Sequence, residues 1–337
     1  MRALVTGATG LVGFEAIEAL RLAGAEEVVG ASRARSAASG EAVAWDMASE
    51  PPPSALQREW DVIVHAAADT RWTMPAAEAE RANVETLRAL EPLVGPATHL
   101  VHVSTAFSVG LRGSVESSDP ADYRNTYEWS KAHAERLVAT DFPRHTIVRP
   151  PLIVGRRGDG RASRFAGMYT LLRALTASMV PVVVADPEAL FEVVPVDAVA
   201  AVLAAAAAAE PRGETQIVAA GAEAPRVEDA VELMAAELNE WRGERGLEPF
   251  DVPRLVSRES WERFFLPFVR DELSARQRGI LDLLSNFEPY LAIREPLEPT
   301  HPVPDAAAAI PAAVRYWAET EQRRASLSPR PWTAAAR

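Results

Sequence analysis

The hydrophobic and polar positions of the chain follow two different patterns. Over the first two thirds, short runs of β-branched residues alternate with longer stretches rich in Ala and Leu. Buried parallel strands are typically continuous apolar runs joined by helices, so this alternation predicts an α/β fold, a doubly wound parallel sheet with helices on both faces. The predicted strands are 2–7, 27–32, 42–45, 62–67, 100–105, 145–150, 181–185 and 215–220, and the predicted helices are 11–23, 78–94, 122–140, 162–179 and 196–209.

From about residue 222 the pattern changes to helices and Pro-containing loops with little β signal. Four aromatic residues there are spaced i, i+3, i+4 and i+7, which places them on one helix face. That face either packs on the main domain, which we favour, or forms the wall of an apolar substrate pocket. We therefore predict an α/β domain at 1–221 with substrate-side elements from about 151, a mostly helical substrate lobe at 222–327 and a tail at 328–337. The aromatic residues are Trp261, Phe264, Phe265 and Phe268.

Composition narrows the class of protein. Hydrophobic residues make up 48% of the chain, enough for a full core, and the formal net charge of -12 argues against a nucleic-acid binder, which needs surplus Lys and Arg. No uninterrupted apolar run approaches the ~20 residues of a membrane span. The first residues, MRALVTGATG, lead directly into a predicted strand and leave no room for a signal peptide. We expect a cytoplasmic protein.

The absence of cysteine limits the chemistry that the chain can perform. It excludes disulfides, zinc–thiolate sites and any mechanism that holds an acyl group on an enzyme thiol. The six histidines have no metal-binding spacing, so we expect no metal site. His65 and His102 fall in predicted strands, and we expect them to be core residues whose hydrogen bonds are satisfied.

A glycine-rich turn joins the first predicted strand to the first helix. In VTGATGLVG, Gly7, Gly10 and Gly13 allow a sharp turn and let a pyrophosphate approach the amides at the helix start. A merely tight loop is the alternative, but this position in an α/β chain favours a Rossmann-type dinucleotide site. Thr9, Leu11 and Val12 would complete it.

The end of the second strand indicates which cofactor binds. NAD-binding chains have an acidic residue there, whereas this chain has Ser32 and Arg33, with Arg35 close by. A guanidinium suits a 2′-phosphate, so NADPH is favoured over NADH. Asp46, followed by Met47, would accept a hydrogen bond from the adenine amino group, or it would cap a helix.

Tyr127 and Lys131 are four residues apart in NTYEWSK and share one helix face. They are either a solvated surface pair or an acid and the cation that adjusts it. A phenol titrates near 10, and an adjacent ammonium favours the phenolate and lowers that pKa. Together with the glycine turn, the pair favours the catalytic interpretation.

The motifs TGATGLVG, HAAADT (65–70), VHVSTAFSVG (101–110), YEWSK and VRPPLIVG (148–155) occur in the order seen in extended short-chain dehydrogenase/reductases. HVSTAFSVG, RPPLIVGRRGDG and FEVVPVDAVA (191–200) resemble the branch of fatty acyl-CoA reductases and thioester reductase domains, the male-sterility type. The resemblance covers about residues 1–210. It implies a catalytic set of Thr105, with Ser104 as its competitor, Tyr127 and Lys131.

The same resemblance implies several neighbouring contacts. Ala66, Ala67 and Ala68 would let the cofactor lie against a strand end, and Pro150 would place backbone groups near the nicotinamide carboxamide. Asn83 would stabilise the active-site loop, or would simply join a helix to that loop. Ser104 and Phe107 would contact substrate.

An arginine-rich loop follows RPPLIV and would lie where substrate enters. Its guanidiniums either hold coenzyme A phosphates or the acidic surface of an acyl carrier protein, or they belong to a solvated glycine-rich loop. The arginines are Arg156, Arg157, Arg161 and Arg164.

Together these features predict an NADPH-dependent reductase that converts an acyl thioester to an aldehyde, and then to an alcohol if a second hydride follows. An aldehyde, ketone or hydroxysteroid-type reductase is the main alternative. A sugar-nucleotide epimerase or dehydratase is disfavoured because Ala106 and Phe107, not carboxylates, follow Thr105. A non-catalytic NADP-binding sensor would usually lack the Tyr/Lys pair. The expected oligomeric state is a monomer or homodimer.

Overall fold

A computed structural model describes residues 1–33, 42–176, 182–269 and 285–328. By its internal contacts the chain forms two compact units, each made of several segments. Unit 1 comprises 1–151, 196–219 and 299–302, and unit 2 comprises 152–195, 220–298 and 303–337. The predicted boundary near residue 221 stays a prediction, although the contacts place the segment 152–195 in unit 2.

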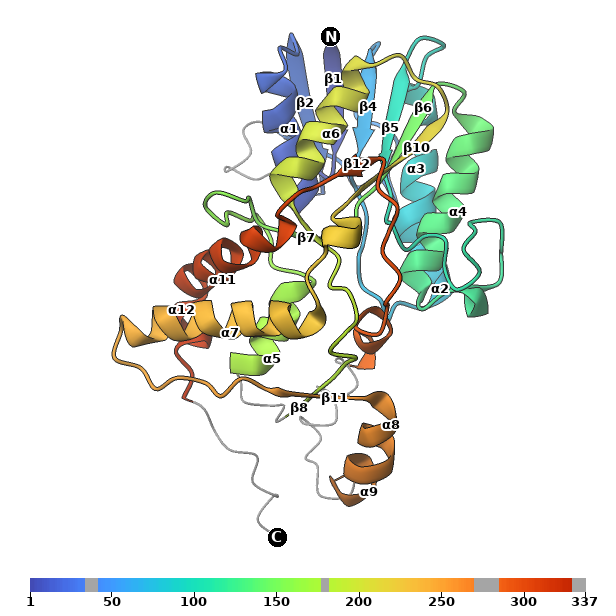
Figure 1. The fold of residues 1–337 in the computed structure, drawn as a ribbon. Coiled ribbons are helices and arrows are strands. Elements are labelled where there is room, and N and C mark those ends of the chain that lie inside the picture. Colours follow the sequence, from blue (N-terminus) through green and yellow to red (C-terminus); the bar gives the residue numbers. More distant parts are fainter. Residues whose placement is uncertain (34–41, 177–181, 270–284, 329–337) are drawn as a thin grey trace. The chain divides into compact units, whose positions relative to one another are not determined.

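Unit 1 is built on the predicted parallel sheet, and the α/β fold is confirmed (Figure 1). The strand order β3-β2-β1-β4-β5-β6 is that of a dinucleotide-binding Rossmann fold, and β10 and β12 extend it beyond β6. The eight strands are β1 (Arg2–Thr6), β2 (Glu27–Ser32), β3 (Val43–Ala44), β4 (Val62–His65), β5 (His99–Val103), β6 (His145–Arg149), β10 (Glu214–Ala219) and β12 (His301–Pro302).

Helices cover both faces of this sheet (Figure 1). Helices α1 (Leu11–Leu22) and α6 (Val196–Ala208) pack on one another on one face. The opposite face is covered by α4 (Thr126–Asp141) and by a helical stretch made of α2 (Ala76–Glu80), a π-helical turn (Arg81–Glu85) and α3 (Thr86–Arg88). The predicted helices at 11–23, 78–94 and 196–209 therefore agree with the structure to within a few residues.

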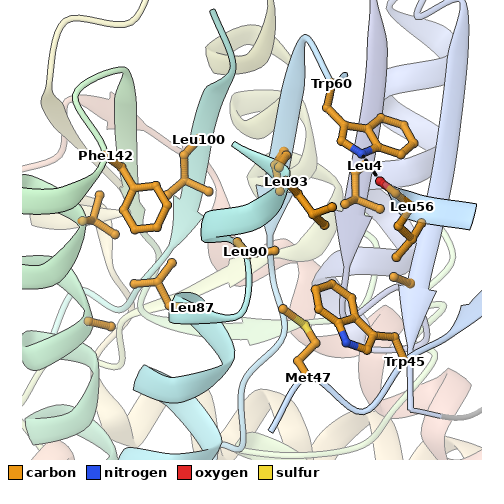
Figure 2. Packing of buried hydrophobic residues seen from close by; sticks show 14 of the residues in the cluster. Leu4, Trp45, Met47, Leu56, Trp60, Leu87, Leu90, Leu93, Leu100 and Phe142 are labelled. Carbon is orange, nitrogen blue, oxygen red and sulfur yellow. Dashed lines mark hydrogen bonds between the residues drawn. The ribbon is translucent and has the colours of Figure 1, made fainter. Parts of the chain in front are cut away.

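The core of unit 1 lies between the sheet and the α3–α4 face. Leu4, Ile63 and Leu100 are neighbours across three strands and are fully buried. Helix α3 adds Leu87 to the same cluster, and Phe142, the C-cap residue of α4, also joins it. Figure 2 shows this packing, including two buried indoles, Trp45 and Trp60.

Unit 2 contains two short parallel strand pairs and most of the C-terminal helices. Helices α7 and α11 pack together around the buried rings of Trp241 and Trp317. Its strands are β7 (Leu152–Val154), β8 (Val182–Val184), β9 (Val193–Pro195) and β11 (Arg254–Val256). Its helices are α5 (Met168–Thr176), α7 (Val227–Gly243), α8 (Arg258–Ser260), a π-helical turn (Trp261–Phe265), α9 (Leu266–Val269), α11 (Ala309–Thr320) and α12 (Gln322–Ala325).

The aromatic stripe of unit 2 differs from the expectation of a packed face. The predicted helix is present as α8, the π-helical turn and α9. However, Phe264 is 59% exposed and Trp261 is half-buried. The side chains of Phe265 and Phe268, and the tail from residue 329, lie outside the described residues.

Candidate active site

The turn at the carboxyl end of β1 requires glycine at two positions, because a side chain there would clash with the backbone. Gly7 has φ +69, and a Cβ added to it would lie 2.6 Å from the carbonyl oxygen of Ala66. A Cβ at Gly13 would lie 2.3 Å from the carbonyl oxygen of Gly7. The N-cap of α1, Gly10, provides no side-chain hydrogen bond, so the first amides of this helix are left to an anion. These residues fit a dinucleotide pyrophosphate.

The other residues predicted to contact the cofactor lie beside this turn and beyond the end of β4. Thr9, Leu11 and Val12 are half-buried at the helix start. Ala67 is half-buried and Ala68 exposed, beyond the end of β4. Small side chains here leave room for a ligand against the strand ends.

At the end of β2, Arg33 is exposed, whereas Arg35 lies outside the described residues. Arg33 lies near the carboxylate of Asp69, beyond β4. Burial alone would raise the pKa of the Asp69 carboxyl. The hydrogen bonds from Arg71 and the positive charges of Arg71 and Arg33 outweigh burial, so this pKa lies below its usual value. Arg33, the residue predicted to bind the 2′-phosphate, therefore lies at the end of β2. It is near the Asp69 carboxylate, which already accepts hydrogen bonds from Arg71.

Asp46 and Met47 are less suited to the adenine contact that we predicted. Asp46 accepts hydrogen bonds from the Ser49 hydroxyl at 2.8 Å and from the Ala48 amide at 3.4 Å, as a residue that caps a turn does. The Met47 side chain is buried in the apolar cluster of unit 1. Only its backbone is left to contact a cofactor.

Helix α4 begins four residues later than predicted, and its first turn carries Tyr127. The side chain of the N-cap, Asn125, accepts from the Glu128 amide at 3.0 Å, and the Glu128 carboxylate accepts from the Arg124 amide at 3.1 Å. This reciprocal capping fixes the helix start. It leaves Tyr127 half-buried at the end of the helix.

Lys131 lies one turn further along α4 and is 1% exposed. Its Nζ donates hydrogen bonds to the carbonyl oxygen of Val103 at 2.7 Å and to His102 Nε2 at 3.1 Å. Burial lowers the pKa of this ammonium to about 8. Lys131 is also the only lysine in the chain, against 34 arginines. At every other Lys or Arg position the chain has the larger guanidinium of arginine, so position 131 is distinguished by a compact amine.

The expected effect of Lys131 on Tyr127 is not what the structure shows. We predicted that the ammonium lowers the pKa of the phenol, but burial raises it, and the negative charge of Glu128 raises it further. The ammonium is directed toward Val103 and His102 on β5. Tyr127 is therefore a protonated hydrogen-bond donor at neutral pH.

The structure distinguishes between the two hydroxyls after β5. Ser104 donates to the buried carboxylate of Glu135, which also binds Ser108 at 2.7 Å and Arg149 Nε at 3.0 Å. Ser104 is thus part of a buried polar network. Thr105, 5% exposed, accepts a weak hydrogen bond from the Phe107 amide at 3.4 Å. Among the described residues, the Ser104 hydroxyl therefore donates to a buried carboxylate, whereas the Thr105 hydroxyl only accepts.

Asn83 forms the helix-to-loop hydrogen bonds that we considered for it. Its side chain accepts from the Asp69 amide at 2.7 Å, donates to the Asp69 carbonyl at 3.1 Å and donates to Ser130 Oγ at 2.8 Å. Ser130 in turn donates to the Tyr127 carbonyl at 2.8 Å. Asn83 lies in the π-helical turn between α2 and α3, a distortion frequent at functional sites. It joins the loop after β4 to α4.

Two further predicted contacts have defined places. Pro150 is buried, and its carbonyl oxygen accepts from the Ala106 amide at 2.9 Å, which ties the strand end to the loop that carries Thr105. Phe107 is half-buried, with the Arg124 guanidinium 5.8 Å from the centre of its ring.

The arginine-rich loop lies in unit 2 and is partly structural. Arg157 donates to the carbonyl oxygens of Pro304 and Asp305 at 2.8 and 2.7 Å. Arg156 is half-buried, whereas Arg161 and Arg164 are exposed. Arg157 therefore serves the fold of unit 2, and the exposed pair is better suited to bind an anion.

Two buried histidines lie closer to the site than the sequence indicates. His65 and His102 are buried, as expected, but each has one ring nitrogen without a partner among the described residues. The prediction that their hydrogen bonds are satisfied is wrong, because each imidazole has two ring nitrogens and only one of them has a partner among the described residues, Thr6 on β1 for His65 and Lys131 on α4 for His102. The hydrogen bond from Lys131 makes His102 part of the site.

Across residues 1–33, 42–176, 182–269 and 285–328, no group of three or more His, Asp or Glu side chains is placed to hold a metal ion. In that same part of the chain, no helix is both long and apolar enough to cross a membrane.

Comparisons with known proteins concern the family and the fold of the chain. Residues 49–203 match the family model described as "Male sterility protein", an NAD-binding domain. No curated protein matches the chain.

Three solved structures with similar folds are the terminal R domain of the myxalamid PKS-NRPS pathway, a thiolation–reductase di-domain from an archaeal non-ribosomal peptide synthetase, and the Bordetella bronchiseptica enzyme WbmH in complex with NAD+. Identity is 19%, 15% and 15%, and the TM-scores are 0.68, 0.65 and 0.62. The matches cover 95%, 96% and 94% of this chain and 91%, 76% and 98% of those chains.

These findings confirm the resemblance that the motifs predicted. Residues 49–203 are similar to the male-sterility NAD-binding family, and the chain shares the Rossmann fold of the solved structures.

Proposed function

We propose that the protein is an NADPH-dependent reductase of acyl thioesters carried on coenzyme A or a carrier protein. The observation that carries this proposal is the presence of Thr105, Tyr127 and Lys131 in one compact unit of a chain without cysteine. The hydroxyls of Thr105 and Tyr127 are suited to donate hydrogen bonds to the oxygen of a reacting carbonyl. Because the chain has no thiol to hold an acyl group, direct hydride transfer to the thioester is the remaining route. The similarity to a terminal R domain and to a thiolation–reductase di-domain supports a thioester on a carrier.

In this proposal NADPH supplies a hydride to the thioester carbonyl carbon. Thr105 and Tyr127 donate hydrogen bonds to the carbonyl oxygen, where negative charge develops. Tyr127 then transfers its proton to this oxyanion, giving a hemithioacetal. Its C–S bond breaks, the thiol leaves with a proton, and the aldehyde remains. Lys131 holds the ribose hydroxyls of the cofactor and stabilises the phenolate after the proton has left.

The preference for NADPH rests on Arg33. The side chain is exposed directly after β2, and no carboxylate occupies the position at which NAD-binding chains hold a ribose 2′-hydroxyl. Changing Arg33 to Ala should weaken NADPH binding about tenfold, the loss of one charge-assisted contact, and leave NADH binding unchanged. Equal affinity of the wild-type protein for both cofactors would contradict this assignment.

The test of the reaction is the consumption of NADPH with a panel of acyl-CoA thioesters, carrier-bound thioesters, free aldehydes and ketones. We expect thioester turnover with release of one thiol per hydride and formation of aldehyde. Tyr127→Phe should abolish turnover while NADPH still binds. Thr105→Ala should lower turnover about 100-fold, as the loss of one oxyanion donor does.

Ser104→Ala is the matched control for Thr105, because it removes a neighbouring hydroxyl that is bound to Glu135. It should lower stability and leave turnover per folded molecule within a few-fold of wild type. Turnover of free aldehydes or ketones alone would contradict the thioester proposal and support the carbonyl reductase alternative.

A further inference from the structure

A row of polar side chains crosses three strands beneath the site. Thr6, His65 and His102 occupy matching register positions on β1, β4 and β5. Thr6 Oγ1 lies 2.8 Å from His65 Nδ1, and the rings of His65 and His102 are stacked with centroids 5.4 Å apart and planes inclined by 19°. His102 contacts Lys131 in turn. The polar row therefore joins the strand end before the glycine turn to the catalytic lysine.

The protonation of His102 follows from its surroundings. Burial, and then the positive charge of Lys131, lower the pKa of this imidazole well below its usual value, so the ring is neutral. Since the lysine ammonium is a donor only, His102 Nε2 is the acceptor and Nδ1 carries the hydrogen. Nδ1 has no partner within the described ranges of the chain.

We propose that His102 is a positioning residue for Lys131. An ammonium has three N–H groups, and His102 Nε2 and the Val103 carbonyl bind two of them. One N–H remains to face the ribose hydroxyls of the cofactor, so the lysine is held in one orientation. This inference rests on the proposed function, in which Lys131 orients the cofactor. It assigns a role to a histidine that touches neither substrate nor cofactor.

Several charged or titratable groups surround the lysine. On its own helix, the negative charge of Glu135 raises the pKa of Lys131, although Arg149 on β6 is paired with that carboxylate. His65 and His102 face Lys131 from β4 and β5, and both are held neutral by burial. Among these groups, His102 is the one that accepts a hydrogen bond from the ammonium.

The single lysine allows a direct test without cofactor or substrate. Protein labelled with ¹⁵N in lysine gives one side-chain signal, so its titration reports Lys131 alone. We expect a midpoint of about 8 in the wild type. Gln places an amide group near the position of Nε2, whereas Asn places one near Nδ1, which makes His102→Gln and His102→Asn a matched pair. His102→Gln should keep the midpoint, and His102→Asn should lower it by about one pH unit, because a buried ammonium loses an acceptor.

Equal midpoints in the wild type and both variants would overturn the proposal. If a variant does not fold, the ¹⁵N shifts of His102 in the wild type decide instead. A neutral ring with hydrogen on Nδ1 supports the proposal, and hydrogen on Nε2 overturns it. NADPH titration at pH 7.5 adds a second readout: about tenfold weaker binding in His102→Asn is expected, and unchanged affinity would overturn the positioning role.

Failure of this inference and failure of the proposed function are distinguishable. The lysine titration and the histidine shifts need no substrate. A wild-type protein that titrates as expected but reduces no thioester would overturn the proposed function and leave the hydrogen bond from Lys131 to His102 in place.

Discussion

Two neighbouring rows of the same sheet face are equally buried but opposite in polarity. Leu4, Ile63 and Leu100 form an apolar row across β1, β4 and β5, and the polar row lies two residues further toward the carboxyl ends, about 7 Å away. The apolar row contributes to the core of unit 1 shown in Figure 2. Within the part of the chain that the structure describes, the polar row has two ring nitrogens without a partner, and it supports Lys131. Burial alone therefore does not identify a core residue. On this sheet face, residues that pack in the apolar core lie only two positions from residues that form the polar row.

The largest effect should come from removing the amine that the polar row supports. Lys131→Met keeps most of the side-chain length and removes a buried charge. We expect kcat/KM to fall about 1,000-fold, close to 4 kcal/mol, with an unchanged or higher free energy of unfolding. Steady-state kinetics and urea unfolding measure the two quantities. A large loss of stability would show that Lys131 belongs to the core instead.

The apolar row should respond in the opposite way. Ile63 is fully buried, so Ile63→Ala should lower the free energy of unfolding by about 3 kcal/mol through lost contacts and the cavity that remains. Turnover per folded molecule should change less than threefold. A large loss of kcat in a folded Ile63→Ala variant would remove the distinction between the rows.

The polar row should make the fold sensitive to acid. Burial lowers the pKa of His65 to about 3 and that of His102 well below its usual value. In the unfolded chain both titrate near 6.5, so the unfolded state binds more protons below that pH, and stability falls as the pH drops from about 6.5 toward 3. We expect each histidine to lower the free energy of unfolding by about 2 kcal/mol at pH 5 relative to pH 7.

Urea unfolding at pH 7, 6 and 5 measures this loss. His102→Gln cannot titrate and should reduce the loss at pH 5 by about 2 kcal/mol, the contribution of one histidine. The same pH dependence in wild type and variant would show that His102 does not take part.

The smallest effect is expected for a hydrogen bond inside the apolar cluster. Unlike the hydrogen bonds of the polar row, it should contribute to stability and not to activity. Trp60 Nε1 donates to the Leu56 carbonyl at 3.0 Å (Figure 2). Trp60→Phe keeps an aromatic ring and loses this hydrogen bond, so stability should fall by about 1 kcal/mol or slightly more, with no change in kinetics. Thermal unfolding and NADPH consumption provide the comparison.

Much of unit 1 could be predicted from the sequence, because its strands are continuous apolar runs between long helices. The glycine turn and the Tyr127/Lys131 pair could be located because spacing alone places them. The start of α4 was harder to predict, since it depends on reciprocal hydrogen bonds between Asn125, Glu128 and the Arg124 amide. The short strands β7, β9, β11 and β12 were missed, because two or three residues carry no periodic signal.

The choice between Ser104 and Thr105 also needed the structure. Nothing local in the sequence shows that Glu135, 31 residues away, binds Ser104. The direction of the Tyr127 pKa was mispredicted for a related reason: helical spacing brings Lys131 near, but the acceptors on β5 determine where its ammonium points. The sequence does carry one further signal for this position, namely that Lys131 is the only lysine.

That lone lysine also bears on chemical compatibility with the proposed product. Aldehydes condense with side-chain amines to form imines and add to thiols. This chain has no cysteine, and its single side-chain amine is 1% exposed. Arginine provides the other basic side chains that are charged at all working pH values, and a protonated guanidinium is a poor nucleophile toward aldehydes. An enzyme that releases aldehyde would therefore expose almost no side chain that its own product could modify.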